Sequence, residues 1–352
     1  MSTPTTTGPR VRHDAAELSI RDSRLRGVAL LHELRRPRRR EFVREGGTWR
    51  LTLPRPEADR LEYLLEVTYR NGRKALLPDP TNPLAAPGPF GEKSVIEFPG
   101  YEAPEWVADE DAAPGALREL PLESVRLRET VPALLWSAAD TDPEQPLPLL
   151  IVHDGPEYAQ FSSLVRLLDH IVDFGEVPEM RAALVPPPAD RNESYSASAR
   201  YANALAADLV PAILRAAPSN RRPVLVGASL GALAALHAHF RNPGLVGGLF
   251  LQSGSFFRQR FDSGEQRFPR FARITRFVGQ VHGRRGFAPR IPATITCGIV
   301  EENFDNNRAL VGALKRRRWD VDAAWHRDAH NWTSWRDSLH PRLAELLLRA
   351  WT

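Results

Sequence analysis

The chain has 352 residues, of which 42% are hydrophobic and 26% are charged, and its formal net charge at pH 7 is +4. This composition is typical of a folded globular protein and excludes an intrinsically disordered one. No segment approaches the roughly 20 apolar residues of a membrane-spanning helix, so we expect no membrane association. The single cysteine, Cys297, excludes an internal disulfide. Together with the lack of an apolar signal segment, it favours a cytoplasmic protein.

The first hundred residues show short apolar runs separated by turn signals. We expect residues 1–17 to be disordered and residues 18–100 to form a small all-β domain of the immunoglobulin-like type. Within it, Asn71-Gly72 separates two apolar runs, which predicts a β-hairpin. The arginine-rich run at 35–40 is interpreted as a solvated edge and not as a nucleic-acid site, because no base-stacking or phosphate-binding motif accompanies it. Residues 101–120, rich in proline, alanine and acidic side chains, are interpreted as a linker.

From residue 121 to residue 352 short β-rich runs alternate with helical patterns. The β-rich runs are 148–154, 181–188, 223–229, 247–254 and 293–302, and the helical stretches are 160–174, 200–217, 230–242 and 264–283. A helix (NNRALVGALKRR), a strand (VDAAWHR) and a C-terminal helix follow. This alternation predicts an α/β domain with a mostly parallel sheet that is covered on both faces. Ligands bind at the carboxyl ends of the strands in such sheets.

The pentapeptide Gly227-Ala228-Ser229-Leu230-Gly231 matches the G-x-S-x-G pattern. A β-rich run precedes it and an alanine-rich helical run follows it, as a nucleophile elbow requires. The glycines leave space around a strained turn, and the helix that begins at Leu230 directs its free N–H groups toward an oxyanion beside Ser229. The sequence therefore predicts a serine nucleophile.

A serine nucleophile needs a base, and the chain order in this fold is serine, acid, histidine. Of the histidines after Ser229, only His330 is predicted to lie in a loop that directly follows the last strand. We expect the others to lie on helices or within that strand: His237, His239, His282, His326 and His340. Glu301 is the predicted acid because it is nearest the end of the preceding strand, and Glu302 is the alternative.

Several motifs occur in the order that they have in one family. They are LLIVHDGPEY, VGASLGALAAL, LFLQSGSFF, CGIVEENFDNNRAL and HNWTSWRDSL. With them, the chain resembles enterobactin-esterase-type members of the esterase D group of α/β-hydrolases. RLEYLLEVTYRNGRKALLPDPTNP and SVIEFPGYEAPEW resemble the early-set immunoglobulin-like domain that precedes the catalytic domain in these esterases. The resemblance implies a serine esterase that hydrolyses carboxylic esters, with siderophore trilactones such as ferric enterobactin as the best-known substrates.

The resemblance also implies a role for individual residues. Ser229 matches the nucleophile, His330 the histidine and Glu301 the acid. The oxyanion donors implied are the N–H of Leu230 and a second donor at Gly155. Two positions depart from the family pattern. Pro156 has no N–H to donate, and Asn331 follows the histidine where family members often carry aspartate. No metal and no organic cofactor is needed for this chemistry.

Two further side chains are candidates for substrate binding. Arg191 follows the second strand and is suited to an anionic or catecholate substrate, whereas an ion pair with Glu193 or another neighbour is the alternative. Trp332 is a candidate for an aromatic wall together with Trp335, and a core position at the start of a helix is the alternative.

Two other functions stay open. One is acyl transfer of the mycolyltransferase type, and the other is carbohydrate binding by a non-catalytic relative. The expected partner is a small-molecule ester, with a ferric siderophore as one candidate, and we expect no nucleic-acid partner. The sequence leaves the oligomeric state open, a dimer included.

Overall fold

The computed structural model describes residues 8–35, 39–283 and 288–352, which divide into two compact units. The first unit extends to Ala103 and also includes two short later segments, Gly298–Glu302 and His326–Ser334. The second unit comprises Pro104–Cys297, Asn303–Trp325 and Trp335–Thr352. In the described part of the chain, no helix combines the length and the apolar character needed to cross a bilayer.

The first unit contains two antiparallel sheets. Its strands are β1 (Arg10–Val11), β2 (Ala15–Ile20), β3 (Leu25–His32), β4 (Arg39–Glu41), β5 (Val43–Glu45), β6 (Thr48–Pro54), β7 (Arg60–Tyr69), β8 (Lys74–Leu77), β9 (Ala85–Ala86) and β10 (Lys93–Glu97). One sheet has the order β1-β2-β6-β5, and the other has β4-β3-β7-β10-β9 with β8 paired to β7. Leu18 and Leu53 of the first sheet share one buried cluster with Leu30 and Leu65 of the second. Burial of this cluster holds the two sheets together.

The predicted hairpin at Asn71-Gly72 is confirmed. It joins β7 to β8, and Gly72 adopts φ +88°, which glycine accepts without strain. The Asn71 side chain accepts a hydrogen bond from the N–H of Arg73 at 3.0 Å. The arginine-rich run 35–40 lies partly outside the described residues. Its last two members belong to β4, which is exposed at the edge of its sheet as expected.

Two expectations about the termini of the first domain are wrong. Disorder was expected over residues 1–17, of which 1–7 lie outside the described residues. β1 and the start of β2 fall within the rest of that range, because Ala16 and Leu18 are buried in the core. The predicted linker 101–120 contains a 3-10 helix, η1 (Glu105–Val107), and the first residues of β11 (Ala116–Ser124). β11 pairs along its length with β12 (Glu129–Ser137), a hairpin that the sequence reading missed.

The second unit is built on an eight-stranded sheet of order β11-β12-β14-β13-β15-β16-β17-β18. Its further strands are β13 (Leu149–His153), β14 (Arg181–Val185), β15 (Val224–Ala228), β16 (Gly248–Gln252), β17 (Ala293–Gly298) and β18 (Val321–His326). β14, β13, β15, β16 and β17 pair in parallel, whereas β11 and β12 add antiparallel strands. This mixed α/β architecture confirms the predicted sheet.

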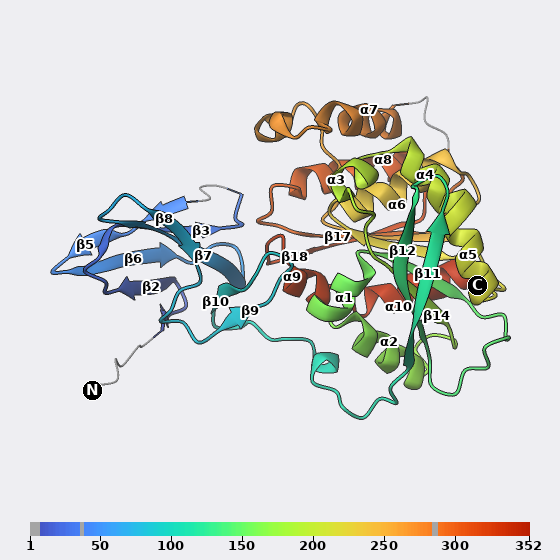
Figure 1. Cartoon of the computed structure of the whole chain (residues 1–352), viewed down its shortest axis with the longest axis horizontal. Coiled ribbons are helices and arrows are strands. Elements are labelled where there is room, and N and C mark those ends of the chain that lie inside the picture. Colours follow the sequence, from blue (N-terminus) through green and yellow to red (C-terminus); the bar gives the residue numbers. More distant parts are fainter. Residues whose placement is uncertain (1–7, 36–38, 284–287) are drawn as a thin grey trace. The chain divides into compact units, whose positions relative to one another are not determined.

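Helices cover the sheet on both sides. They are α1 (Gly155–Phe161), α2 (Leu164–Asp173), α3 (Arg191–Tyr195), α4 (Ala199–Ala204), the π-helical η2 (Leu205–Leu209), α5 (Val210–Ala216), α6 (Leu230–Arg241), the 3-10 helix η3 (Ser263–Arg267), α7 (Phe271–His282), α8 (Phe304–Arg316), α9 (Trp332–Asp337) and α10 (Arg342–Trp351). In Figure 1, α4, α6, α7 and α8 lie on one side of the sheet, and α1, α2 and α10 lie on the other. The C-terminal helix begins only at Arg342, so the expectation that His340 lies within it is wrong.

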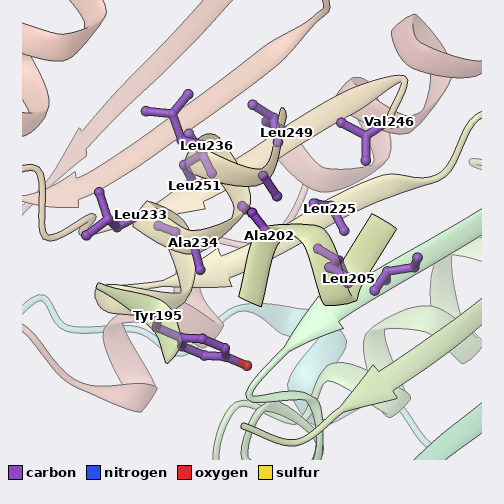
Figure 2. Close-up of a cluster of buried hydrophobic side chains, with 14 of the residues drawn as sticks. Tyr195, Ala202, Leu205, Leu225, Leu233, Ala234, Leu236, Val246, Leu249 and Leu251 are labelled. Atoms are coloured by element: carbon purple, nitrogen blue, oxygen red, sulfur yellow. The ribbon is translucent and has the colours of Figure 1, made fainter. Parts of the chain in front are cut away.

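The core of the second unit lies between α6 and the parallel strands. Figure 2 shows Leu236 of α6 near Leu251 of β16, and Leu233 and Leu249 belong to the same buried cluster. Almost every residue of α6 is buried, because its alanines let the helix approach the sheet closely while α4 packs against it. The dense packing around α6 fixes the position of its first turn.

Candidate active site

Ser229 occupies the turn between β15 and α6, as the pentapeptide predicted. Its backbone adopts φ +54° and ψ −120°, a conformation that non-glycine residues rarely adopt. The Ser229 N–H donates to the carbonyl of Gln252 at 2.9 Å, and its carbonyl accepts the N–H of Ser255 at 3.0 Å. These bonds to the end of β16 and the residues after it hold the strained turn in place.

The two glycines of the pentapeptide are required for different reasons. A Cβ on Gly227 would lie 2.5 Å from the carbonyl carbon of Gly231 and 2.6 Å from its oxygen. A Cβ on Gly231 would lie 3.0 Å from Oδ2 of Asp154 and 3.3 Å from Cβ of His153. The first glycine therefore allows the strand and the helix to cross. The second allows the first turn of α6 to pack against the end of β13.

Ser255 is a side chain that the sequence reading did not single out. Its hydroxyl lies 3.2 Å from the Ser229 hydroxyl, and the residue is only 3% exposed. The motif LFLQSGSFF contained it, but no spacing rule indicated that the second serine of that motif faces Ser229. Their proximity lets Ser255 orient the Ser229 hydroxyl by a hydrogen bond in which either oxygen can donate.

Glu301 and His330 are brought together within the first unit. Oε2 of Glu301 accepts a hydrogen bond from Nδ1 of His330 at 2.8 Å, while Oε1 accepts the N–H of Gly298 at 2.9 Å. Glu301 is completely buried, whereas Glu302 is exposed. Because an Nδ1–H bound to a carboxylate leaves Nε2 without a proton, this pair sets the tautomer that a general base requires.

The electrostatics of His330 follow from this contact. Burial alone would lower the pKa of His330, but the charge of Glu301 and the hydrogen bond to it raise the pKa above its ordinary value. The carboxylate of Glu33 in the same unit also favours the charged imidazolium, and Lys93 opposes it. The protonated form of His330, the imidazolium, is thereby stabilised.

The segments that carry Glu301 and His330 are bound to N-terminal segments of the same unit that lie between strands. The N–H of Arg35 donates to the carbonyl of Val300 at 2.9 Å, and the N–H of Asp59 donates to the carbonyl of Arg327 at 2.8 Å. The Asp59 carboxylate also accepts a hydrogen bond from the Arg327 side chain at 3.0 Å. Residues far apart in the sequence therefore support the acid–histidine pair.

Asn331, which departs from the family pattern, has a structural role. Its Oδ1 accepts the N–H of Ser334 at 2.8 Å, which caps the first turn of α9. Because Glu301 already binds the His330 ring, an asparagine at this position leaves the acid–histidine pair intact.

Leu230 and Gly155, the predicted oxyanion donors, are the first residues of α6 and α1. The N–H groups of a first helical turn have no partner within the helix, and they form the positive end of its dipole. Pro156 follows Gly155 in the helix and cannot donate. Close packing also requires a glycine at position 155, because a Cβ there would lie 2.4 Å from Cα of Leu184.

Arg191 forms an ion pair, and its partner is Asp154 instead of Glu193. Its Nε and Nη2 bind the two carboxylate oxygens at 2.7 Å each. Burial alone would lower the pKa of Arg191, but the hydrogen bonds and charge of Asp154 raise it. Glu193 binds Arg270 and Arg273. Since Asp154 packs beside Gly231, the Arg191–Asp154 pair lies next to the first turn of α6.

The two tryptophans differ in their surroundings. Trp335 is 6% exposed, and its Nε1 donates to the hydroxyl of Ser253 at 3.0 Å, so it is a core residue. Trp332 begins α9 and is half-buried. Of the two, only Trp332 keeps surface that a substrate can contact.

Comparison with known families agrees with this geometry. Residues 135–346, more than half of the chain, match the model of the Esterase family, which is described as "Putative esterase". No curated protein matches the chain.

Solved structures with the same fold include two enterobactin esterases. The enterobactin esterase from Shigella flexneri, crystallised in the presence of 2,3-di-hydroxy-N-benzoyl-serine, shares 20% identity and a TM-score of 0.76 over 98% of this chain and 97% of that one. The ferric enterobactin esterase from Salmonella typhimurium shares 20% identity and a TM-score of 0.75 over 98% and 97%. A ferulic acid esterase covers 67% of this chain and 98% of its own, with 17% identity and a TM-score of 0.56.

At these identities the likeness of the solved structures concerns the fold, while the family match concerns the chain itself. The family match and the shared fold together confirm the predicted resemblance to the enterobactin-esterase type. The chain belongs to the Esterase family and is a carboxylic ester hydrolase.

Proposed function

We propose that the protein is a serine esterase in which Ser229, His330 and Glu301 form the catalytic triad. The observation that carries the proposal is the backbone of Ser229, which is strained at φ +54° immediately before α6. A hydrogen-bonded acid–histidine pair supports it. Ser229 follows the carboxyl end of β15, Glu301 follows that of β17, and His330 follows that of β18. Catalytic residues of α/β sheets gather at such ends.

In the proposed mechanism, the Ser229 hydroxyl attacks the ester carbonyl carbon while Nε2 of His330 accepts its proton. Glu301 stabilises the resulting imidazolium through Nδ1. The tetrahedral intermediate collapses when His330 protonates the leaving alcohol, which leaves an acyl group on Ser229. Water then attacks the acyl-enzyme with His330 again as the base, and the acid is released. No step requires a metal or an organic cofactor.

We propose that the N–H groups of Leu230 and Gly155 donate hydrogen bonds to the oxyanion of both tetrahedral intermediates. Each is the first residue of a helix, so two helix dipoles favour negative charge at this position. Ser255 would orient the nucleophile, since its hydroxyl lies 3.2 Å from that of Ser229.

For the substrate we propose a catecholate trilactone of the enterobactin type. The fold likeness to enterobactin esterases extends over almost the whole chain, and one of those proteins was crystallised in the presence of enterobactin. The Arg191–Asp154 pair uses Nε and Nη2 of the guanidinium, so Nη1 can bind an anionic catecholate. Trp332 would contact the aromatic rings of the substrate.

We further propose that the two sheets of the first unit form the immunoglobulin-like domain that the resemblance implies. Their shared buried cluster supports this assignment. Cys297 is the single cysteine of the chain and is buried, which supports a reducing location, the cytoplasm.

The test compares wild type with two serine variants on p-nitrophenyl esters and on an enterobactin-type trilactone, both iron-free and ferric. Ser229→Ala should reduce kcat by on the order of 10³-fold or more without changing the melting temperature. Ser255→Ala is the matched control, and we expect a loss of about fivefold, the worth of one hydrogen bond.

Each outcome decides one part of the proposal. If Ser255→Ala abolishes turnover and Ser229→Ala does not, the nucleophile is misassigned. If wild type cleaves the p-nitrophenyl esters but not the trilactone, the substrate proposal fails while the esterase mechanism stands. Transfer of the acyl group to an added alcohol in preference to water would favour the acyltransferase. A wild type inert on every ester would favour the carbohydrate-binding alternative.

A further inference from the structure

Two histidines and a glutamate converge in the second unit outside the proposed active site. They are His170 near the end of α2, Glu176 between α2 and β14, and His340 before α10. One ligand atom of each lies within 4.8 Å of those of the other two. Nε2 of His170 lies 3.5 Å from Oε1 of Glu176, and Nε2 of His340 lies 2.8 Å from Oε2. We propose that this cluster binds a divalent transition-metal ion of the zinc class.

The spacing of the cluster suits such an ion. Zinc binds imidazole nitrogen and carboxylate oxygen at about 2.0–2.2 Å in a tetrahedron, so neighbouring ligand atoms lie about 3.3–3.5 Å apart. The 3.5 Å between Nε2 of His170 and Oε1 of Glu176 falls in this range. Nε2 of His340 lies 2.8 Å from the other oxygen, Oε2, so an ion bound to both histidines and one oxygen of Glu176 needs a small shift of the His340 ring. Two imidazoles and one carboxylate form a ligand set that zinc favours, with a fourth position for water.

A second carboxylate prepares His170 for this role. Oδ2 of Asp109 lies 2.6 Å from Nδ1 of His170 and accepts its hydrogen, which leaves Nε2 on the side of Glu176 as a lone-pair donor. Arg166 holds the segment that carries Asp109, because its Nη1 donates to the carbonyls of Val107 and Asp109 at 3.1 and 3.0 Å. A carboxylate bound to the far nitrogen of a ligand histidine is the usual support of a zinc site.

The surroundings allow the ion to enter and to stay. The side chains of His170, Glu176 and His340 are 18%, 32% and 26% exposed, so the cluster is partly shielded and partly accessible to solvent. Glu176 and His340 are 164 residues apart in the sequence. An ion bound to both would connect the end of α2 and the segment before β14 to the segment before α10.

The position of the cluster indicates a structural role for the ion. Glu176 precedes the amino end of β14, whereas ligands of parallel sheets bind at the carboxyl ends of the strands. The ion would bind the folded protein but not the dispersed ligands of the unfolded chain, and binding would therefore stabilise the fold. The ester chemistry proposed above does not involve it, and the two proposals stand or fall separately.

The experiment uses the full chain, freed of metal with a chelator and dialysed. Zn²⁺ is titrated by calorimetry, and Co²⁺ is added to a second sample to record its visible absorption bands. We expect one equivalent of Zn²⁺ to bind with a dissociation constant on the order of micromolar or tighter. A hundredfold excess of Zn²⁺ over that constant should raise the melting temperature by about 5 °C. The cobalt bands should have the intensity of a four- or five-coordinate ion.

Three variants and a control complete the test. His340→Ala and Glu176→Gln should each weaken binding by about 100-fold, and Asp109→Asn, which acts through His170, by about tenfold. Glu176→Gln keeps the shape of the side chain, so it remains informative if His340→Ala fails to fold. His13→Ala, an exposed histidine of the first unit, should leave binding unchanged. Absence of a one-equivalent site in wild type, or wild-type affinity in either ligand variant, would overturn the proposal.

Discussion

The turn at Ser229 and the pair formed by Glu301 and His330 obtain their geometry in different ways. The conformation of Ser229 is encoded locally, by a strand, a glycine two residues away on each side and a helix that starts at the next residue, and hydrogen bonds to Gln252 and Ser255 then hold it. The pair depends on contacts that are distant in the sequence. Glu301 and His330 are 29 residues apart, and the segments around them bind Arg35 and Asp59.

The comparison shows which features of a site a short sequence motif can reveal and which only the tertiary structure can reveal. A strained conformation needs particular residues at particular spacings, so it leaves a short motif. A hydrogen bond between two loops needs only that the fold brings them together, and many loop residues can satisfy it. The serine turn should therefore be sensitive to changes within its pentapeptide. The acid–histidine pair should also respond to changes in the N-terminal segments around Arg35 and Asp59.

The largest effect is expected for Gly227→Ala. The added Cβ would lie 2.5 Å from backbone atoms of Gly231, which cannot move without displacing α6. We expect destabilisation of about 3 kcal/mol or more, measured by denaturant unfolding, and loss of esterase activity. Gly279→Ala is the matched control, because Gly279 lies in α7 with open space around its Cα, and alanine there should stabilise by about 0.5–1 kcal/mol. Equal stability of the two variants would contradict the local origin of the turn.

Glu301→Gln is expected to reduce kcat by about 10²–10⁴-fold, because the imidazolium of His330 loses its stabilising charge. It should also change the pH profile. The proposed mechanism needs neutral His330, and Glu301 raises the pKa of that histidine, so wild-type activity should fall as the pH decreases through a value above the ordinary 6.5. In the variant this acidic limb should move to lower pH. The measurement is kcat/KM against pH.

Glu302→Gln serves as the control for that variant, since Glu302 was the alternative acid and is exposed. We expect its kcat and its pH profile to stay within about threefold of wild type. A larger loss with Glu302→Gln than with Glu301→Gln would reassign the acid.

The smallest effect is expected for Asp59→Ala, which tests the support from the N-terminal segment before β7. Asp59 binds Arg327, three residues before His330, through a half-exposed ion pair. Its removal should lower kcat by about two- to fivefold with little change in KM, at a cost of about 1 kcal/mol in stability. Asp22→Ala breaks a comparable ion pair, with Arg24, that does not contact the histidine loop. It should change stability alone; an equal loss of kcat in both variants would refute specific support.

By itself the sequence determined the features that depend on local order. These are the alternation of strands and helices, the hairpin at Asn71-Gly72, and the turn at Ser229, whose glycines have steric reasons. It also indicated Glu301 and His330 through the position of each after a strand. The predictions of the alternation, the hairpin and the turn are confirmed, because periodicity, turn chemistry and steric exclusion act between neighbours in the chain. The catalytic roles of Glu301 and His330 stay predictions.

Only the tertiary structure decided the features that depend on distant contacts. It showed Ser255 beside Ser229, and it showed Asp154 as the partner of Arg191. It added the hairpin of β11 and β12, in which β12 joins the large sheet by pairing with the later strand β14. It also gathered His170, Glu176 and His340, which no sequence spacing links. Folding creates such contacts between residues whose separation carries no repeated pattern, so their physical origin is packing and not local preference.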